Sequence, residues 1–250
     1  MTSALRISGL TKRFGALLVT DNVSFDIAPG ELHAVIGPNG AGKTTLINQL
    51  SGELQSDAGS IFFGERDVTT LPIHQRVRAG LLRSYQITSI FEGFTVLENV
   101  TLAALGAKAH AFGFWRQMLA NKRAVGQAQE MIAASGLSGK GDVVAGELGY
   151  GERRQLELAM SLAAAPQILL LDEPMAGMST QEAAAVTTLL QGLKRKYAIL
   201  LVEHDMDAVF ALADRITVLV YGKVMFTGTP DEVRNHPEVR AVYLGEESIA

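Results

Sequence analysis

Changes in the spacing of apolar side chains divide the first fifty residues into predicted strands and a helix. Residues 5–7 and 23–27 alternate apolar and polar positions, and the Pro-Gly pair at 29–30 predicts a turn after them. Leu32, Ala34, Val35 and Ile36 form an apolar run, which is typical of a strand. The apolar positions within residues 46–50 are spaced as on one side of a helix.

The middle of the chain is dominated by helical patterns. Residues 57–60 are predicted to turn into a strand at residues 61–63, and the Ala- and Leu-rich residues 95–137 read as helices. Residues 151–165 place apolar side chains on one side of a helix, which Pro166 ends.

Strands and helices continue to alternate in the last third of the chain. Apolar strands are predicted at residues 168–171, 199–202 and 216–220, with a helix at residues 206–213. The run at residues 168–171 is of the kind buried on both faces. This alternation predicts an α/β fold with a mostly parallel sheet covered by helices, and 250 residues suffice for one such domain.

Two further helices carry start signals. Ser179 and Glu182 have the spacing of a capping box before an Ala-rich run. Thr229, Pro230 and Glu232 supply a cap, a first-turn proline and the reciprocal acid of a second box.

Composition narrows the function class. Lys and Arg number 22 against 26 Asp and Glu, a formal net charge of −4, and no basic block stands out, so nucleic-acid binding is not expected. Cysteine is absent, which excludes disulfides and thiolate metal sites and fits a reducing compartment. Residues 1–10 show no secretory signal, and the apolar stretch 156–171 is too interrupted to span a bilayer.

A glycine-rich motif follows the strand predicted at residues 32–36. Residues 37–45 read G-P-N-G-A-G-K-T-T and precede a helix, which is the order of a phosphate-binding loop rather than of an ordinary turn. Its glycines let successive N–H groups converge on phosphate oxygens, and the helix N-terminus adds positive charge. Lys43 can reach the β- and γ-phosphates, and the Thr44 hydroxyl can hold Mg²⁺. The predicted nucleotide-binding residues are Gly37, Pro38, Asn39, Gly40, Ala41, Gly42, Lys43, Thr44 and Thr45.

Two acids follow the strand at residues 168–171, at the end where open α/β sheets bind ligands. Asp172 can support the Mg²⁺ shell, because Mg²⁺ prefers oxygen ligands. Glu173 is placed to polarise a water in line with the γ-phosphate. A pair of exposed acids in a turn is the alternative interpretation.

A third motif, L-G-Y-G-E at residues 148–152, opens a helix about twenty residues before Asp172. With this signature loop in place, the chain resembles the ATP-binding subunits of ABC transporters over essentially its whole length. The resemblance also rests on Phe14, Gln86 in S-Y-Q, E-N-V at residues 98–100 and His204 in V-E-H-D.

The resemblance implies a fold and an organisation. It implies a P-loop NTPase (RecA-like) core, an N-terminal antiparallel β subdomain and an inserted α-helical subdomain at approximately residues 90–165. Residues 1–250 would form a single ABC-type domain, with a C-terminal extension at approximately residues 229–250.

The resemblance also implies roles for single residues. Phe14 would stack on the adenine ring, with a core aromatic as the alternative. Gln86 would contact Mg²⁺ and the attacking water, although a polar loop residue can be plain surface. His204 would hydrogen-bond the γ-phosphate and orient Glu173, although a lone histidine is usually structural.

The signature loop would act in trans. In the family two subunits meet head to tail, and Gly149, Tyr150, Gly151 and Glu152 of one would face the γ-phosphate held by the other. Gly149 replaces the usual serine, which removes one hydrogen bond to a charged group, worth about 1.5–3 kcal/mol. A second departure is Ser179, which stands where the inter-subunit loop usually has aspartate.

Within the family, the chain most resembles the ATPases of importers for branched-chain and related amino acids. That resemblance rests on residues 90–100, 173–179, 212–216 and 243–245, although similar tails occur in ATPases of lipopolysaccharide export. It implies an ATPase at the cytoplasmic face of the inner membrane that binds ATP and Mg²⁺.

The expected partners are a second ATP-binding subunit, a transmembrane permease and, indirectly, an external solute-binding protein. The apolar side chains of Ile90, Phe91 and Phe94 would either receive a helix of the permease or pack inside the helical lobe. Alternative functions are lipopolysaccharide or lipid export, a soluble ABC ATPase of DNA repair or translation, and a simple P-loop kinase or switch. The last class would require neither the loop at residues 148–152 nor His204.

Overall fold

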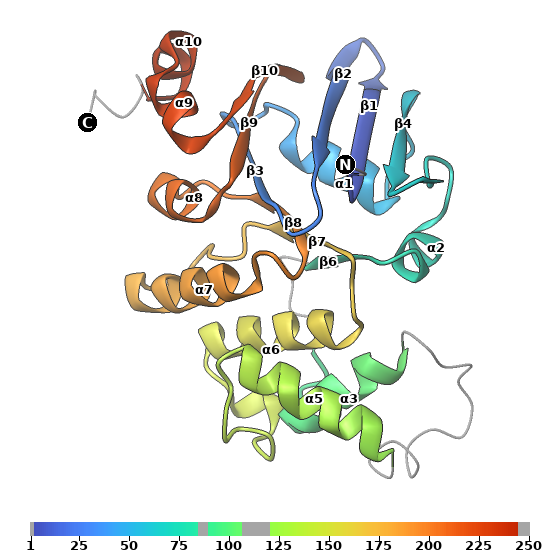
Figure 1. Cartoon of the computed structure of the whole chain (residues 1–250), viewed down its shortest axis with the longest axis vertical. Helices are drawn as coiled ribbons and strands as arrows, with labels where there is room; N and C mark the ends of the chain where they lie inside the picture. The colour runs from blue at the N-terminus through green and yellow to red at the C-terminus, as the bar shows by residue number, and fades with distance from the viewer. Residues whose placement is uncertain (1–2, 85–89, 107–120, 245–250) are drawn as a thin grey trace. The chain divides into compact units, whose positions relative to one another are not determined.

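The computed structural model describes residues 3–84, 90–106 and 121–244. The predicted site residue Gln86 lies outside these ranges, as does Gly245 of the predicted tail motif. The chain divides into two compact units, drawn in Figure 1. The first unit comprises Met1–Leu81, Gln167–Glu173 and Leu193–Ala250, and the second comprises Leu82–Pro166 and Pro174–Gly192.

The first unit contains a four-stranded antiparallel sheet. Its strands are β1 (Leu5–Phe14), β2 (Leu17–Ile27), β4 (Ala58–Phe63) and β5 (Arg66–Asp67), in the spatial order β2-β1-β4-β5. Alternate side chains of β1 and β2 are buried, including Leu5, Ile7, Val23, Phe25 and Ile27. The alternation predicted from the sequence is therefore confirmed.

The turn predicted at residues 57–60 is wrong, because β4 already begins at Ala58. Gly59 has a φ angle of 91°, and a Cβ atom at this position would lie 2.4 Å from the carbonyl oxygen of Gly9 on β1. The glycine that suggested a turn instead allows two strands to approach closely.

The second sheet has the spatial order β10-β9-β3-β8-β7-β6, and all of its strands except the edge strand β6 lie entirely in the first unit. The strands β3, β7, β8 and β9 pair in parallel, and β10 pairs antiparallel with β9. Every residue of β3, β7 and β8 is buried, which explains why they read as apolar runs and confirms the α/β prediction. The six strands are β3 (Leu32–Ile36), β6 (Leu81–Ser84), β7 (Ile168–Asp172), β8 (Ala198–Val202), β9 (Arg215–Val220) and β10 (Lys223–Gly228).

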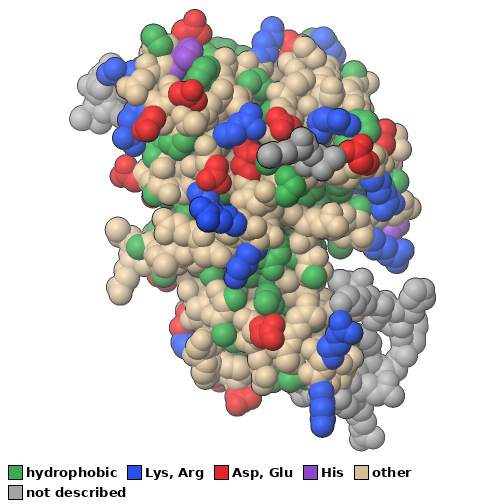
Figure 2. All heavy atoms as spheres, in the orientation of Figure 1, with side chains coloured by type: hydrophobic (Ala, Val, Ile, Leu, Met, Phe, Trp, Pro, Cys, Tyr) green, Lys and Arg blue, Asp and Glu red, His purple; other side chains and the backbone are tan. Residues whose placement is uncertain are grey.

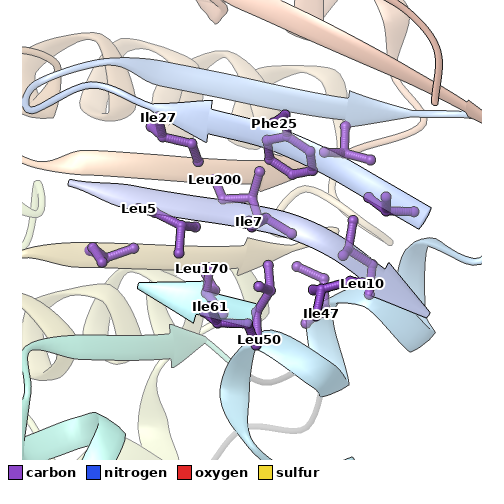
Figure 3. Packing of buried hydrophobic residues seen from close by; sticks show 14 of the residues in the cluster. Leu5, Ile7, Leu10, Phe25, Ile27, Ile47, Leu50, Ile61, Leu170 and Leu200 are labelled. Atoms are coloured by element: carbon purple, nitrogen blue, oxygen red, sulfur yellow. The ribbon is translucent and has the colours of Figure 1, made fainter. Parts of the chain in front are cut away.

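The helix that follows the glycine-rich loop is anchored in the core of the first unit. This helix, α1 (Lys43–Ser51), buries Leu46, Ile47 and Leu50 completely. Figure 3 shows Ile47 and Leu50 within a cluster that includes side chains from both sheets. Burying a leucine or isoleucine contributes roughly 1.5–3 kcal/mol, so this packing fixes the position of the loop in front of the helix.

The other helices of the first unit are short. They are α2 (Ile73–Arg78), α8 (Met206–Leu212), α9 (Pro230–Asn235) and α10 (Pro237–Val239), followed by a π-helical segment at Arg240–Leu244. The capping box predicted for α9 is confirmed. The Thr229 hydroxyl accepts from the Glu232 N–H at 3.3 Å, and the Glu232 carboxylate accepts from the Thr229 N–H at 2.7 Å.

The second unit is helical in the parts that the structure describes. Its helices are α3 (Val96–Gly106), α5 (Lys122–Ala134) and α6 (Tyr150–Ala163), with a 3-10 turn at Ala145–Glu147, and α7 (Thr180–Leu193) begins in this unit. Val100, Ile132, Leu156 and Ala159 belong to one buried apolar cluster that joins α3, α5 and α6. Helices predicted within residues 95–137 and 151–165 are thereby confirmed where they are described.

The surface carries mixed charge. On the face shown in Figure 2, Lys and Arg side chains are interspersed with Asp and Glu. No described helix is both long and apolar enough to cross a bilayer.

Candidate nucleotide-binding site

The glycine-rich loop leaves β3 and is held between carbonyl groups of two other strands. A Cβ atom at Gly37 would lie 2.1 Å from the Leu219 oxygen on β9, and one at Gly42 would lie 2.5 Å from the Val19 oxygen on β2. Gly40 and Gly42 have φ angles of 77° and 101°, which side chains rarely adopt. At these contacts only glycine fits, so the backbone can turn its N–H groups toward an anion at the start of α1.

Lys43 is the first residue of α1, and its side chain folds back over the loop. Its ammonium donates to the Gly37 oxygen at 2.6 Å and the Pro38 oxygen at 3.1 Å, and the residue is buried. Burial lowers the pKa of Lys43, while the negative charges of Glu173 and Asp172 oppose that shift. The cation therefore lies in the loop and within electrostatic reach of both acids, whereas Thr44 is exposed.

The two predicted acids stand at the carboxyl end of β7. Asp172 is its last residue and is buried. Glu173 has a φ angle of 48°, an uncommon conformation for a residue other than glycine, and its N–H donates to the Val202 oxygen on β8 at 2.8 Å. This backbone bond holds Glu173 at the edge where β7 and β8 end together.

His204 reaches the same edge from the end of β8. Its Nε2 atom lies 2.6 Å from Oε1 of Glu173, and the His204 side chain is 44% exposed against 23% for Glu173. The structure thus joins a predicted catalytic acid to the histidine predicted to orient it, across 31 positions of sequence.

Phe14 ends β1 with its ring half exposed, so the alternative of a core aromatic is wrong. The Lys12 ammonium lies 5.8 Å from the centre of this ring. Phe14 is thus open to stacking by a planar ligand.

The motif at residues 148–152 lies in the second unit and begins α6. Gly149 is the N-cap with extended backbone, Gly149 and Tyr150 are exposed, and Gly151 is buried. The Glu152 carboxylate accepts from the Gly149 N–H at 3.3 Å and pairs with Lys140. The bond from Lys140 holds the pKa of Glu152 below its usual range.

Other residues of the second unit brace this turn. The Tyr150 hydroxyl donates to the Ala176 oxygen at 3.1 Å. The Gly151 N–H donates to Oε1 of Glu182 at 3.3 Å, while Oε2 of Glu182 accepts from the Ser179 N–H at 2.9 Å and from the Ser179 hydroxyl at 2.7 Å. The box predicted for Ser179 and Glu182 is confirmed, but the contact with Gly151 was not predicted.

Arg153 is a further residue that sequence reasoning missed. Its guanidinium donates to the Leu148 oxygen at 3.0 Å and the Gly146 oxygen at 2.8 Å, and pairs with Glu92 at 3.1 Å. An arginine inside an amphipathic helix reads as solvated, so nothing in the spacing indicated this contact.

The comparisons with known proteins agree with the motifs. Residues 20–176 match the ABC transporter family, and residues 223–248 match the branched-chain amino acid ATP-binding cassette transporter family. The high-affinity branched-chain amino acid transport ATP-binding protein LivG of Salmonella typhimurium is 39% identical over 249 residues, which covers 97% of this chain and 98% of LivG. The lipopolysaccharide export system ATP-binding protein LptB of Acidithiobacillus ferridurans is 33% identical over 248 residues, or 99% of each chain.

A solved structure matches the fold over nearly the full chain. The ATP-binding cassette MJ1267 of an ABC transporter, in its ADP conformation, has a TM-score of 0.84 and 28% identity, covering 98% of this chain and all of that one. The predicted P-loop NTPase fold is therefore confirmed.

Proposed function

Because the chain belongs to the ABC transporter family of ATP-binding ATPases, we propose that it drives uptake of branched-chain or related amino acids through a membrane permease. The LivG match and the family match at residues 223–248 support that substrate class. The LptB match supports lipopolysaccharide export as the second candidate, at lower identity.

Hydrolysis is assigned to the edge where β3, β7 and β8 end. Water attacks the γ-phosphorus, the bond to the β–γ bridging oxygen breaks, and ADP leaves as the second product beside inorganic phosphate. Glu173 takes a proton from the attacking water. His204 orients the Glu173 carboxylate and forms a hydrogen bond with the γ-phosphate. The 2.6 Å contact between Glu173 and His204 is the single observation that best supports this assignment.

The loop would hold the triphosphate, and the Lys43 ammonium would move from the carbonyl oxygens of Gly37 and Pro38 to the phosphate oxygens. Phe14 would stack on the adenine. Within the described residues, no three His, Cys, Asp or Glu side chains gather as a metal site. The protein would hold Mg²⁺ with the oxygens of Thr44 and Asp172, and with Gln86 by resemblance, and phosphate and water oxygens would complete the shell. When bound, Mg²⁺ neutralises developing phosphate charge.

Pairing completes the site. A second ATP-binding subunit, identical or related, would present Gly149, Tyr150, Gly151 and Glu152 to the nucleotide of the first. ATP favours the paired state only through contacts that the open state lacks, and loss of the γ-phosphate removes that preference.

A permease would hold the motor at the cytoplasmic face of the inner membrane, and an external solute-binding protein would act through the permease. Phe91 is half exposed and stacks on Phe94 with ring centres 5.3 Å apart, which supports these side chains as part of the permease-facing surface. Purifying the complex with its native membrane partner and identifying the permease separates import from export.

Glu173→Gln tests the catalytic assignment. The amide cannot accept the proton of water, so we expect ATP turnover to fall about 10²–10⁴-fold while ATP binding persists and an ATP-bound pair accumulates. Lys43→Ala is the control for lost nucleotide binding, and it should show neither binding nor turnover. Unchanged steady-state turnover in the Glu173→Gln chain would remove Glu173 from this role.

A further inference from the structure

The carboxylate of Glu182 lies at the N-terminus of α6, where the proposed function places the partner's nucleotide. Its Oε1 atom accepts from the Gly151 N–H, and this N–H belongs to the first turn of a helix, whose donors have no intrahelical acceptor. The helix N-terminus attracts negative charge. An anion supplied by the chain itself therefore already occupies one of the donors expected for phosphate.

The Glu182 carboxylate also fills the space beside Gly151. A Cβ atom at this position would lie 2.6 Å from Oε1 of Glu182 and 3.0 Å from its carboxyl carbon. A phosphate oxygen cannot approach the Gly151 N–H while the carboxylate remains there. Glu182 keeps a second anchor in the Ser179 N–H and hydroxyl, so it can leave Gly151 without losing the cap of α7.

We propose that Glu182 is an internal competitor of the partner's nucleotide: its carboxylate holds the signature turn in the unpaired chain and must leave Gly151 when a γ-phosphate arrives. This inference rests on the proposed function, because it requires pairing across ATP. Competition between the Glu182 carboxylate and the γ-phosphate matters more in this chain because Gly149 has no side-chain hydroxyl. The phosphate would then depend on backbone N–H donors, one of which is the Gly151 N–H. The contact thus sets how much ATP is needed to close the pair.

Glu182→Gln tests the competition. Glutamine also serves in a capping box, so α7 keeps its start, but the side chain loses its charge. A neutral amide oxygen accepts a weaker hydrogen bond than a carboxylate, so Gly151 should be released several-fold more readily in the variant. In the Glu173→Gln background, pairing measured by analytical ultracentrifugation during an ATP titration should be half complete at about 3- to 10-fold less ATP.

The chain offers a matched control in Glu232→Gln. Glu232 makes the same capping box with Thr229, at the start of α9. Both variants lose a first-turn charge, so both should show a similar small drop in thermal stability, but only Glu182→Gln should lower the ATP requirement. Glu182→Ala, which removes the competitor entirely, should shift the titration in the same direction.

The outcomes separate the two proposals. Pairing of the Glu173→Gln chain with an unchanged or higher ATP requirement in Glu182→Gln overturns the inference alone. A Glu173→Gln chain that does not pair at any ATP concentration overturns the proposed function and the inference with it. A lower ATP requirement that Glu232→Gln reproduces also overturns the inference, because the effect is then not specific to Gly151.

Discussion

The glycine-rich loop and the turn that opens α6 would both bind phosphate, yet they are built differently. The loop follows the fully buried strand β3 and precedes a helix packed into the core. The turn is exposed at Gly149 and Tyr150 and is braced by side chains of its own unit. A segment that is held by few, partly exposed hydrogen bonds opens locally at a low cost in free energy. The loop is therefore suited to hold each bound nucleotide in one geometry, and the turn is suited to change its contacts on pairing.

Arg76 contacts the C-terminal end of the helix that follows the loop, Arg153 contacts the turn itself, and the two arginines show the same contrast. Arg76 on α2 is fully buried, and it donates to four carbonyl oxygens at 2.7–2.8 Å, those of Gln49, Leu50, Leu71 and Thr69. Two of these lie in the last turn of α1, whose carbonyls lack intrahelical partners. Arg153 makes two such bonds, and its side chain is 29% exposed.

Arg76→Met should give the largest loss of stability. Methionine fills the space of the stem but leaves four carbonyls without this donor, and each buried unsatisfied group costs about 1–3 kcal/mol. Part of that is offset because a buried guanidinium no longer needs to be desolvated. We expect the free energy of unfolding in urea to fall by about 3 kcal/mol. The control is Arg78→Met on the exposed side of α2, which should change it by less than about 0.5 kcal/mol.

A loss in Arg76→Met no greater than that of its control would break the contrast, since the loop would then not depend on buried polar support. Arg76→Lys sharpens the test. One ammonium cannot satisfy carbonyls that a planar fork reaches in several directions, so the lysine variant should fall between methionine and the natural chain.

Arg153→Met should cost less, about 1–1.5 kcal/mol, because water can reach the carbonyls of Leu148 and Gly146 once the guanidinium is gone. The ion pair with Glu92 should contribute little, since the Glu92 side chain is 69% exposed. Glu92→Gln alone should therefore change the free energy of unfolding by less than about 0.5 kcal/mol, and exposed Arg123→Met on α5 serves as the surface control. If Glu92→Gln lowered the free energy of unfolding as much as Arg153→Met, the ion pair rather than the bonds to the two carbonyls would stabilise the turn.

The contrast also explains what the sequence could predict. The strands that end at Asp172 and shortly before Gly37 and His204 were predictable, because strands buried on both faces consist mostly of apolar residues. Their meeting at one sheet edge follows from parallel pairing. The helix α2 and the strand β10 were missed, because most of their side chains are exposed or half exposed and their apolar positions show no regular spacing.

The bracing contacts were beyond sequence reasoning for another reason. Arg76 and Gln49 are 27 positions apart, and Gly151 and Glu182 are 31 apart, with no motif joining either pair. The spacing of Glu182 from Ser179 already had a sufficient explanation as a capping box. When a residue's position is already explained by one structural role, the sequence does not indicate that it has a second role.

Tyr150→Phe should have the smallest effect and separates two ways of holding the turn. The hydroxyl bond to the Ala176 oxygen lies in an exposed setting, so water can replace it, and we expect a loss below about 0.5 kcal/mol in the free energy of unfolding. The ring also lies 5.7 Å from the Arg154 guanidinium, a contact that phenylalanine keeps and alanine loses. Tyr150→Ala should therefore cost about 1 kcal/mol more than Tyr150→Phe. Equal losses in the two variants, measured by the same urea titration, would mean that Tyr150 acts through its hydroxyl and not through its ring, and the turn would then depend on directed polar bonds as the phosphate loop does.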